Sequence, residues 1–379
     1  GSANITITNG TARSGYNVTY QSGSSYGQLT VTAAPLTITA DSRSKVYGSA
    51  LTVGSGSTAF TSSGLQNGQT IGSVTLGSAN NYAASTTQGV GTYANEITIS
   101  GATGGTFTAS NYSITYVAAP LTITAKPLTL SYTAAHKVYD GTTAATVTDS
   151  LSGVINGDTV SVSETAAFSD KNVGSTKTVN ITGITLGGTH AANYSVASST
   201  SVTADITAKA LTISGLTSAN KVYDATTTAN VTGTASLQSS TTAGSGTSSD
   251  GKWYTGDDVV LSGTAVGTFN SKNVASATTV SFSGLSLTGA DATNYTLTAH
   301  PSAAHTISAK PLTISGLSSQ NKIYDGSTTA TVNGTAALQA AIAAGTGTSS
   351  DGKRYTGDTV GLTGTEVCAF DSKDLVSAT

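Results

Sequence analysis

A short phrase of lysine, a β-branched residue and tyrosine occurs four times in this chain of 379 residues. The four tyrosines are 92, 84 and 101 positions apart, which is the size of a small domain and too long for one coil of a solenoid. The phrase therefore predicts an array of related modules, and arrays usually provide reach and multivalency. Its copies are Lys45-Val46-Tyr47-Gly48, Lys137-Val138-Tyr139-Asp140, Lys221-Val222-Tyr223-Asp224 and Lys322-Ile323-Tyr324-Asp325.

A second phrase, in which proline or alanine precedes Leu-Thr, marks the boundaries between modules. We interpret it as the last strand of one module running into the first strand of the next, with a short, stiff connection because proline fixes φ and lacks an N–H. The full phrase runs from a β-branched residue through Thr-Ala or Ser-Ala to Pro-Leu-Thr or Ala-Leu-Thr. Its four copies have their proline or alanine at Pro35, Pro127, Ala210 and Pro311. They predict modules at 35–126, 127–209 and 210–310, the C-terminal part of a preceding module at 1–34, and the N-terminal part of another at 311–379.

The alternation of residues between these boundaries predicts an all-β fold. Aliphatic residues alternate with Ser or Thr, as in Val160 to Val162 and Leu285 to Leu287, which is typical of strands buried on one face. Only 9% of residues are charged, which disfavours helical bundles. We expect tandem small β-sandwich modules of Ig-like type arranged as a rod, with β-grasp-like modules as the alternative. One short helical turn is expected at 64–68.

Several classes of partner are disfavoured by composition. The net charge is −3 and there is no basic block, so nucleic acid is not an expected partner. No apolar run reaches about 18 residues, so we expect no membrane contact in this segment. A single cysteine, Cys368, cannot form a disulfide within the chain, and methionine is absent, so we expect a piece of a longer protein whose modules are stabilised by packing.

No pattern in the sequence predicts catalysis, a cofactor or a metal site. The four histidines occupy different places in different modules, and no nucleophile elbow is present, so the chain is not expected to be an enzyme. Aspartates at 250, 257, 258, 351 and 358 offer oxygen ligands for Ca²⁺, but turn capping is the favoured interpretation, because neither an EF-hand nor a nonapeptide spacing occurs. Nine Asn-X-Ser/Thr sequons leave glycosylation open. The lysine before each tyrosine is expected to be solvated, which disfavours a Lys–Asn isopeptide bond.

A ligand surface is predicted only weakly, in the insertion shared by the last two copies. Trp253 and Tyr254 are the best candidates for ligand contact, because sugar faces stack on aromatic rings. The corresponding positions in the next copy are Arg354 and Tyr355, so the repeat does not keep the tryptophan.

The tyrosine phrases also support a resemblance to known families. The copies at 137–143, 221–227 and 322–328, with an Asn-Tyr strand after each complete copy, resemble YDG domains. The segment at 35–126 is similar to the MBG domain of the YGX type, through Lys45-Val46-Tyr47-Gly48 and the strand that begins at Asn111. Such repeats occur in very large secreted, filamentous haemagglutinin-like adhesins of Gram-negative bacteria. The resemblance implies an extracellular stalk or filament segment at the bacterial surface, and a carbohydrate- or receptor-binding adhesin module is the alternative.

The two partial modules are complementary in sequence. The segment at 370–379 aligns with 269–278, and the first residues resemble the strand that follows in the complete copy. We therefore expect neighbouring modules or copies of this chain as partners, with glycans or biofilm matrix as further candidates. Strand donation from one copy to the next gives a head-to-tail fibre; the competing interpretation is that the same strands are supplied within a longer array. The expected strand donors are Ile5, Ile7, Val18, Leu29 and Val31.

Overall fold

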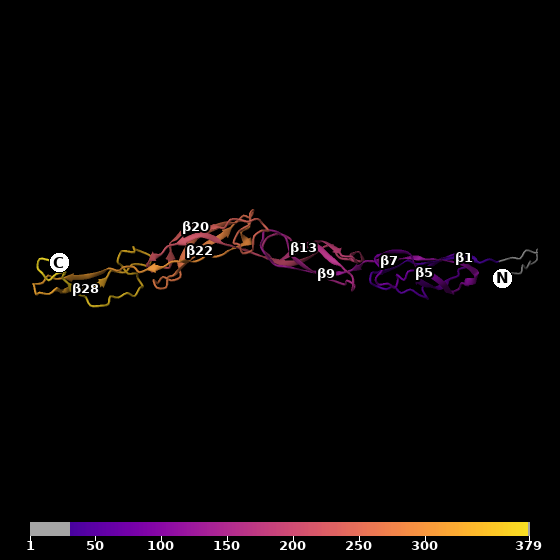
Figure 1. Ribbon diagram of the computed structural model, residues 1–379, viewed down its shortest axis with the longest axis horizontal. Helices are drawn as coiled ribbons and strands as arrows, with labels where there is room; N and C mark the ends of the chain where they lie inside the picture. The colour runs from indigo at the N-terminus through magenta and orange to yellow at the C-terminus, as the bar shows by residue number, and fades with distance from the viewer. Residues whose placement is uncertain (1–30, 378–379) are drawn as a thin grey trace, which may run out of the picture. The chain divides into compact units, whose positions relative to one another are not determined.

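The computed structural model describes residues 31–377 and confirms the all-β prediction (Figure 1). Within these residues the helical elements are three single turns of 3₁₀ helix, η1 (Ala109–Asn111), η2 (Ala191–Asn193) and η3 (Ala292–Asn294). The predicted helical turn at 64–68 is wrong, because this segment is an irregular loop that ends in a turn at Asn67 and Gly68, both at positive φ. No helix in the described part of the chain has the length and apolar character needed to cross a membrane.

The described residues form two compact units. Unit 1 contains 31–133, Val147–Ala166 and Asn180–Val202, and unit 2 contains Ala134–Thr146, Ala167–Val179 and 203–377. These units are defined by packing, whereas the modules are defined by sequence repeats, and the two divisions do not coincide. The module boundaries stay a prediction.

The first repeat lies in unit 1 and consists of two sheets around one core. Leu36 and Ile38 from one sheet pack with Ile97, Leu121 and Ile123 from the other, and all five are buried. Side chains alternate between core and solvent along each strand, which is why β-branched residues and threonine share these segments. The first sheet has the order β3-β1-β6 and the second β2-β7-β5-β4, formed by β1 (Ala34–Ala40), β2 (Arg43–Val46), β3 (Phe60–Ser63), β4 (Ile71–Ser78), β5 (Gly91–Gly105), β6 (Tyr112–Val117) and β7 (Ala119–Thr124).

The first and last strands of this repeat run parallel to each other. β1 pairs with β6 from Ala34↔Tyr112 to Thr39↔Val117, and β2 continues the same pairing with β7 from Arg43↔Leu121 to Val46↔Thr124. Because both segments run in one direction, the chain enters this repeat at one end and leaves it at the opposite end.

The other strands with residues in unit 1 belong to the second repeat. β8 pairs in parallel with β14, so the entry and exit strands of this repeat are also parallel. β10, which lies in unit 2, pairs in parallel with the last residues of β15. The sheet order is β10-β15-β13-β12, and the strands are β8 (Lys126–Pro127), β9 (Thr129–Ala134), β10 (Lys137–Val138), β11 (Val147–Ser152), β12 (Ser161–Phe168), β13 (Gly174–Gly187), β14 (Tyr194–Ser195) and β15 (Thr200–Thr207).

Unit 2 contains the third repeat, whose core includes Phe269, Val280, Phe282 and Ile307. Parallel pairs of β16 with β23 and β18 with β25 again place its entry and exit at opposite ends. The strands are β16 (Lys209–Leu211), β17 (Ile213–Ser218), β18 (Lys221–Val222), β19 (Thr228–Ala229), β20 (Val231–Leu237), β21 (Val260–Phe269), β22 (Thr279–Thr288), β23 (Tyr295–Leu297), β24 (Ala303–Ala304) and β25 (Ile307–Ser308).

The segment from residue 311 repeats part of this arrangement. β26 (Ile314–Ser319) pairs with β28 (Val332–Leu338), and β27 (Thr329–Ala330) pairs with β29 (Cys368–Ala369). Its apolar side chains are more exposed than those of the third repeat. Ile314 and Leu317 are 53% and 43% exposed, whereas the corresponding Ile213 and Leu216 are buried.

Candidate functional site: the tyrosine–aspartate joints

In three of its four copies, the tyrosine of the repeated phrase contacts an aspartate of the following repeat, and we call each such contact a joint. In joint 2, the hydroxyls of Tyr139 and Tyr295 donate to the same Oδ2 of Asp257, at 2.9 and 2.6 Å. Lys171 Nζ donates to Oδ1 of this carboxylate at 2.6 Å. The two tyrosine rings pack edge to face, with centroids 5.3 Å apart. One buried carboxylate therefore binds three side chains from different segments.

Local structure brings these side chains together. Tyr139 directly follows β10, and its N–H bonds to the Thr207 carbonyl at the end of β15. Asp257 follows Gly256, which has a φ of +97° that favours glycine, and its N–H closes the turn on the Tyr254 carbonyl at 3.1 Å. Tyr295 begins β23, and its hydroxyl accepts a 2.9 Å hydrogen bond from the Tyr254 N–H.

Joint 1 in unit 1 has the same arrangement. The Tyr47 hydroxyl donates to Asp158 at 2.9 Å, and the Tyr194 hydroxyl donates to the same oxygen. The rings are again edge to face at 5.4 Å, and the Ile155 N–H donates to the Tyr194 hydroxyl at 3.0 Å. The apolar cluster of the first repeat continues through both tyrosines to Leu128, so the joint is part of that core.

Asparagine next to the second tyrosine adds a further contact to both joints. Asn193 Oδ1 accepts from the Val90 N–H at 2.9 Å in joint 1, and Asn294 Oδ1 accepts from the Val173 N–H at 2.9 Å in joint 2. In joint 2 the Asn294 amide also donates to the side chain of Asn172 at 3.1 Å. The Asn-Tyr dipeptide therefore binds through both of its side chains.

Joint 3 contains one tyrosine on its aspartate. The Tyr223 hydroxyl bonds to Asp358 at 2.8 and 2.9 Å, and Lys272 Nζ lies 3.9 Å from the carboxylate. Within residues 31–377, no second tyrosine hydroxyl bonds to Asp358. Tyr223 is half-buried, whereas Tyr47 and Tyr139 are buried.

The charges in the joints fit these contacts. Burial opposes ionisation of Asp257, but hydrogen bonds from Lys171 and the two tyrosines outweigh it and hold the pKa of its carboxyl below the usual value. Burial, followed by the Asp257 carboxylate, raises the pKa of Tyr139 to about 12 against the opposing effect of Lys171. Burial and then Asp158 likewise raise the pKa of Tyr194 to about 12. At neutral pH joints 1 and 2 therefore each hold an ionised aspartate and neutral tyrosine donors.

The lysine of the repeated phrase is bonded inside its own repeat. The expectation that it is solvated is wrong for Lys45, Lys137 and Lys221, which are buried or half-buried, whereas Lys322 is exposed. Lys137 Nζ donates to Asp140 at 2.8 Å, to the Thr142 carbonyl at 2.8 Å and to the Ala144 carbonyl at 2.9 Å. Lys221 and Lys322 repeat this pattern with Asp224 and Asp325. The ammonium group fixes the turn that follows the tyrosine.

A second, more buried lysine anchors the insertion. Lys209 lies fully buried in β16, 2.9 Å from Asp250, and its Nζ is 4.3 Å from the Tyr254 ring centroid. Lys310 and Asp351 repeat the pair at 2.9 Å. Asp250 and Asp351 also accept backbone N–H groups, from Lys252 and Lys353 respectively. Among the described residues no group of three or more His, Cys, Asp or Glu is placed to hold a metal ion.

The two residues predicted to contact a ligand, Trp253 and Tyr254, make contacts within the protein. Tyr254 is 2% exposed, so its ring is not available at the surface and instead belongs to joint 2. Trp253 is half-buried, and its indole N–H donates to the Gln238 carbonyl at 3.0 Å; sugar binding at Trp253 stays a prediction. Of the expected strand donors, Val31 is 68% exposed, and Ile5, Ile7, Val18 and Leu29 lie outside the described residues.

Sequence reasoning missed the joint aspartates as partners of the tyrosines. A signal was present, because each Gly-Asp dipeptide recurs once per repeat at 157–158, 256–257 and 357–358, in step with the tyrosines. Its interpretation as a turn was correct but incomplete. The first repeat carries Gln69 at the corresponding position, where it accepts from the Tyr112 hydroxyl.

Comparison with protein families agrees with these repeats. The YDG domain model matches residues 124–202 and 207–303, and the model of the MBG domain (YGX type) matches residues 36–122. No curated protein matches the chain. The chain thus contains one MBG domain of the YGX type followed by two YDG domains.

Proposed function

We propose that this chain is a segment of an extracellular stalk or filament of a bacterial surface adhesin, in which the domains are linked in series and carry tension. The YDG and MBG domains are consistent with an adhesin-like repeat protein. A stalk must pass force from domain to domain without a compliant linker. The observation that carries the proposal is the parallel pairing of the entry and exit strands in each complete repeat.

Parallel terminal strands are loaded in shear. When the two ends of the MBG domain are pulled apart, β1–β2 and β6–β7 are drawn in opposite directions along their length. The hydrogen bonds of the β1–β6 ladder, from Ala34↔Tyr112 to Thr39↔Val117, and those of the β2–β7 ladder, from Arg43↔Leu121 to Val46↔Thr124, are then each loaded together instead of one after another. Such a domain resists extension more strongly than one whose strands peel apart.

The joints support the same function. In joint 2 a carboxylate at 8% exposure contacts both tyrosines and Lys171, so relative motion of the bonded segments breaks several hydrogen bonds at once. Charge-assisted hydrogen bonds of this kind are stronger than neutral ones. We therefore propose that the connections between repeats are stiff.

Force spectroscopy tests this function. The chain, with Cys368→Ser, is pulled in one experiment from its two ends and in another from cysteines introduced at Thr70 and Thr106, two exposed positions flanking the Ile71↔Gly105 end of the β4–β5 pair. The second geometry peels that pair apart, so we expect a lower rupture force for the MBG domain than in end-to-end pulling. Equal forces in the two geometries would remove the support for a tension-bearing role.

We also propose that copies of this chain assemble by strand complementation. The exposed apolar side chains at 311–377, including Ile314, Leu317 and Val367, need a partner, and strand addition supplies both ladder bonds and apolar contacts. Ile5, Ile7, Val18, Leu29 and Val31 of a second copy are the proposed donors. Electron microscopy of the chain with and without residues 1–34 tests this step. Fibres that form equally well without the segment would contradict donation.

A further inference from the structure

The turn of joint 1 contains an Asn-Gly pair, Asn156-Gly157, between the two residues that contact Tyr194. The Ile155 N–H donates to the Tyr194 hydroxyl at 3.0 Å, and the Asp158 carboxylate accepts from the same hydroxyl. The Asp158 N–H closes the turn on the Ile155 carbonyl at 3.0 Å, with Gly157 at a φ of +96°. Both contacts to Tyr194 therefore depend on the spacing between Ile155 and Asp158.

The corresponding turn of joint 2 has threonine in place of the asparagine. The same two contacts to Tyr295 come from the Tyr254 N–H at 2.9 Å and the Asp257 carboxylate at 2.6 Å. The residues between them are Thr255-Gly256. The geometry of the turn is therefore kept without an Asn-Gly pair.

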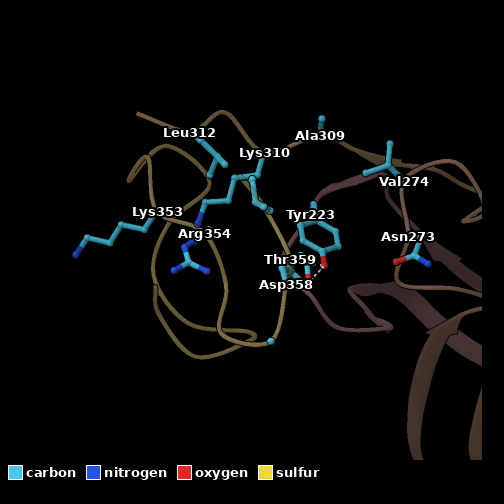
Figure 2. Close-up of a pocket in the computed structure, with 12 residues that line it drawn as sticks. Tyr223, Asn273, Val274, Ala309, Lys310, Leu312, Lys353, Arg354, Asp358 and Thr359 are labelled. Atoms are coloured by element: carbon cyan, nitrogen blue, oxygen red, sulfur yellow. Dashed lines mark hydrogen bonds between the residues drawn. The ribbon is translucent and has the colours of Figure 1, made fainter. Parts of the chain in front are cut away.

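Joint 3 also has threonine at this place. Figure 2 shows Asp358 next to Thr359, with the hydroxyl of Tyr223 bonded to its carboxylate. The residues before Asp358 are Thr356-Gly357. Joint 1 is thus the one joint of the three whose turn contains an asparagine followed by glycine.

Asn156 and Gly157 lack the contacts that would hinder a reaction between them. Both residues are exposed. Within residues 31–377, neither the Asn156 side chain nor the Gly157 N–H forms a hydrogen bond. No heavy atom lies within 4 Å of the position that a Cβ of Gly157 would take. Glycine also has no side chain to shield its nitrogen, so this nitrogen can approach the Asn156 side chain.

We propose that Asn156 is a site of spontaneous modification, whose conversion to isoaspartate or aspartate loosens joint 1 with time. The backbone nitrogen of Gly157 attacks Cγ of Asn156 and forms a C–N bond. The side-chain nitrogen leaves as ammonia, with the proton that the Gly157 nitrogen loses. Water then opens the resulting succinimide, at its backbone carbonyl to give isoaspartate or at its side-chain carbonyl to give aspartate. The reaction consumes one water molecule and needs no oxidant or reductant.

Both products weaken joint 1. Isoaspartate adds a methylene group to the backbone between Ile155 and Asp158, which changes the spacing on which the contacts to Tyr194 depend. Either product also adds a carboxylate two positions before Asp158. Joint 2 has Lys171 on its carboxylate, whereas the corresponding residue of joint 1 is Gln88, so no lysine offsets the added charge. This release does not depend on the stalk function proposed above.

Incubation of the full chain in mildly alkaline buffer tests the modification. Tryptic peptides are analysed by mass spectrometry, with electron-transfer fragmentation to separate isoaspartate from aspartate. Asn333-Gly334 is the matched control, because the same pair lies in β28 and is paired with β26. We expect isoaspartate to form at Asn156 at least about tenfold faster than at Asn333, since the strand pair must first open locally. An equal rate at the two sites, or no conversion of Asn156, would overturn the proposal.

Hydrogen exchange before and after incubation tests the release. The Ile155 N–H should exchange about tenfold faster or more after incubation, because its contact with the Tyr194 hydroxyl is lost. The Tyr254 N–H of joint 2 is the internal reference and should keep its rate. Asn156→Thr, which gives joint 1 the residue of joints 2 and 3, should prevent the change while leaving the other Asn-Gly pairs in place. Isoaspartate at this position with an unchanged exchange rate at Ile155 would overturn the release of joint 1.

Discussion

The hydroxyl of Tyr139 donates a 2.9 Å hydrogen bond to the carboxylate of Asp257, which lies 118 positions further along the chain in the next repeat. Tyr47 and Asp158, and Tyr223 and Asp358, form the same contact at separations of 111 and 135 positions. The repeated tyrosine is therefore a residue of the connection between repeats. The stability of each connection depends on side chains from two neighbouring repeats.

Removing the Tyr139 hydroxyl should destabilise joint 2. Tyr139→Phe keeps the ring contact with Tyr295 but loses one hydrogen bond to a charged acceptor, which is worth about 1.5–3 kcal/mol. The single tryptophan, Trp253, precedes Tyr254 of the joint, so its fluorescence in urea reports this region. Tyr324→Phe is the matched control, because Tyr324 has the same place in its phrase but is 58% exposed. An unchanged urea midpoint for Tyr139→Phe would show that the hydroxyl does not stabilise the joint.

Neutralising the joint carboxylate should have a larger effect. Asp257→Asn leaves Lys171 without its 2.6 Å partner and weakens acceptance from both tyrosines. We expect the free energy of unfolding reported by Trp253 to fall by about 2–4 kcal/mol, since the hydrogen bonds of three side chains to one buried carboxylate are weakened together. Asp149→Asn, at an exposed position, should change it little. Equal effects of the two substitutions would argue against a structural role for the Asp257 charge.

The joints should weaken at both extremes of pH. The pKa of Asp257 is lowered on folding, so its contribution to stability is present above the unfolded pKa of about 3.9 and is lost as the pH falls through the folded value. The pKa of Tyr139 is raised to about 12, so its contribution is complete below the unfolded value of about 10 and is lost as the pH rises toward 12. The urea midpoint measured by Trp253 fluorescence should therefore decline both at low pH and at high pH. In Tyr139→Phe the urea midpoint should fall less steeply as the pH rises above about 10. An identical fall in that variant would show that other groups cause the loss of stability at high pH.

The buried Lys209 should hold the insertion closed. Lys209→Met removes the ion pair with Asp250 and should lower the free energy of local opening by about 2 kcal/mol, giving about 30-fold faster trypsin cleavage after Lys252. Mass spectrometry of the fragments measures this rate. The next copy is an internal control, because Lys310 and Asp351 remain intact and cleavage after Lys353 should not change. Parallel acceleration at both sites would indicate general unfolding.

Much of the fold followed from local pattern. The period-2 alternation correctly predicted strands, because a pleated segment with one buried face requires it. The turn at Gly256-Asp257 was also correctly predicted, since only its own backbone was needed. The joint itself was not predicted, because the pairing of Asp257 with Tyr139 depends on the register between repeats, which local spacing does not specify. Lys137 was wrongly expected to be solvated, because two of its four acceptors are backbone carbonyls, whose positions cannot be read from residue types.

The most direct test of the tyrosine–aspartate joints is a double-mutant cycle on Tyr139→Phe and Asp257→Asn. Urea unfolding of the full chain is followed by Trp253 fluorescence for the parent, the two single variants and the double variant. The contact predicts an interaction energy of about 1 kcal/mol or more, because Tyr139→Phe should cost less in the Asp257→Asn background, where the hydroxyl has already lost its charged acceptor. Strictly additive effects of the two substitutions would contradict an energetic connection between neighbouring repeats.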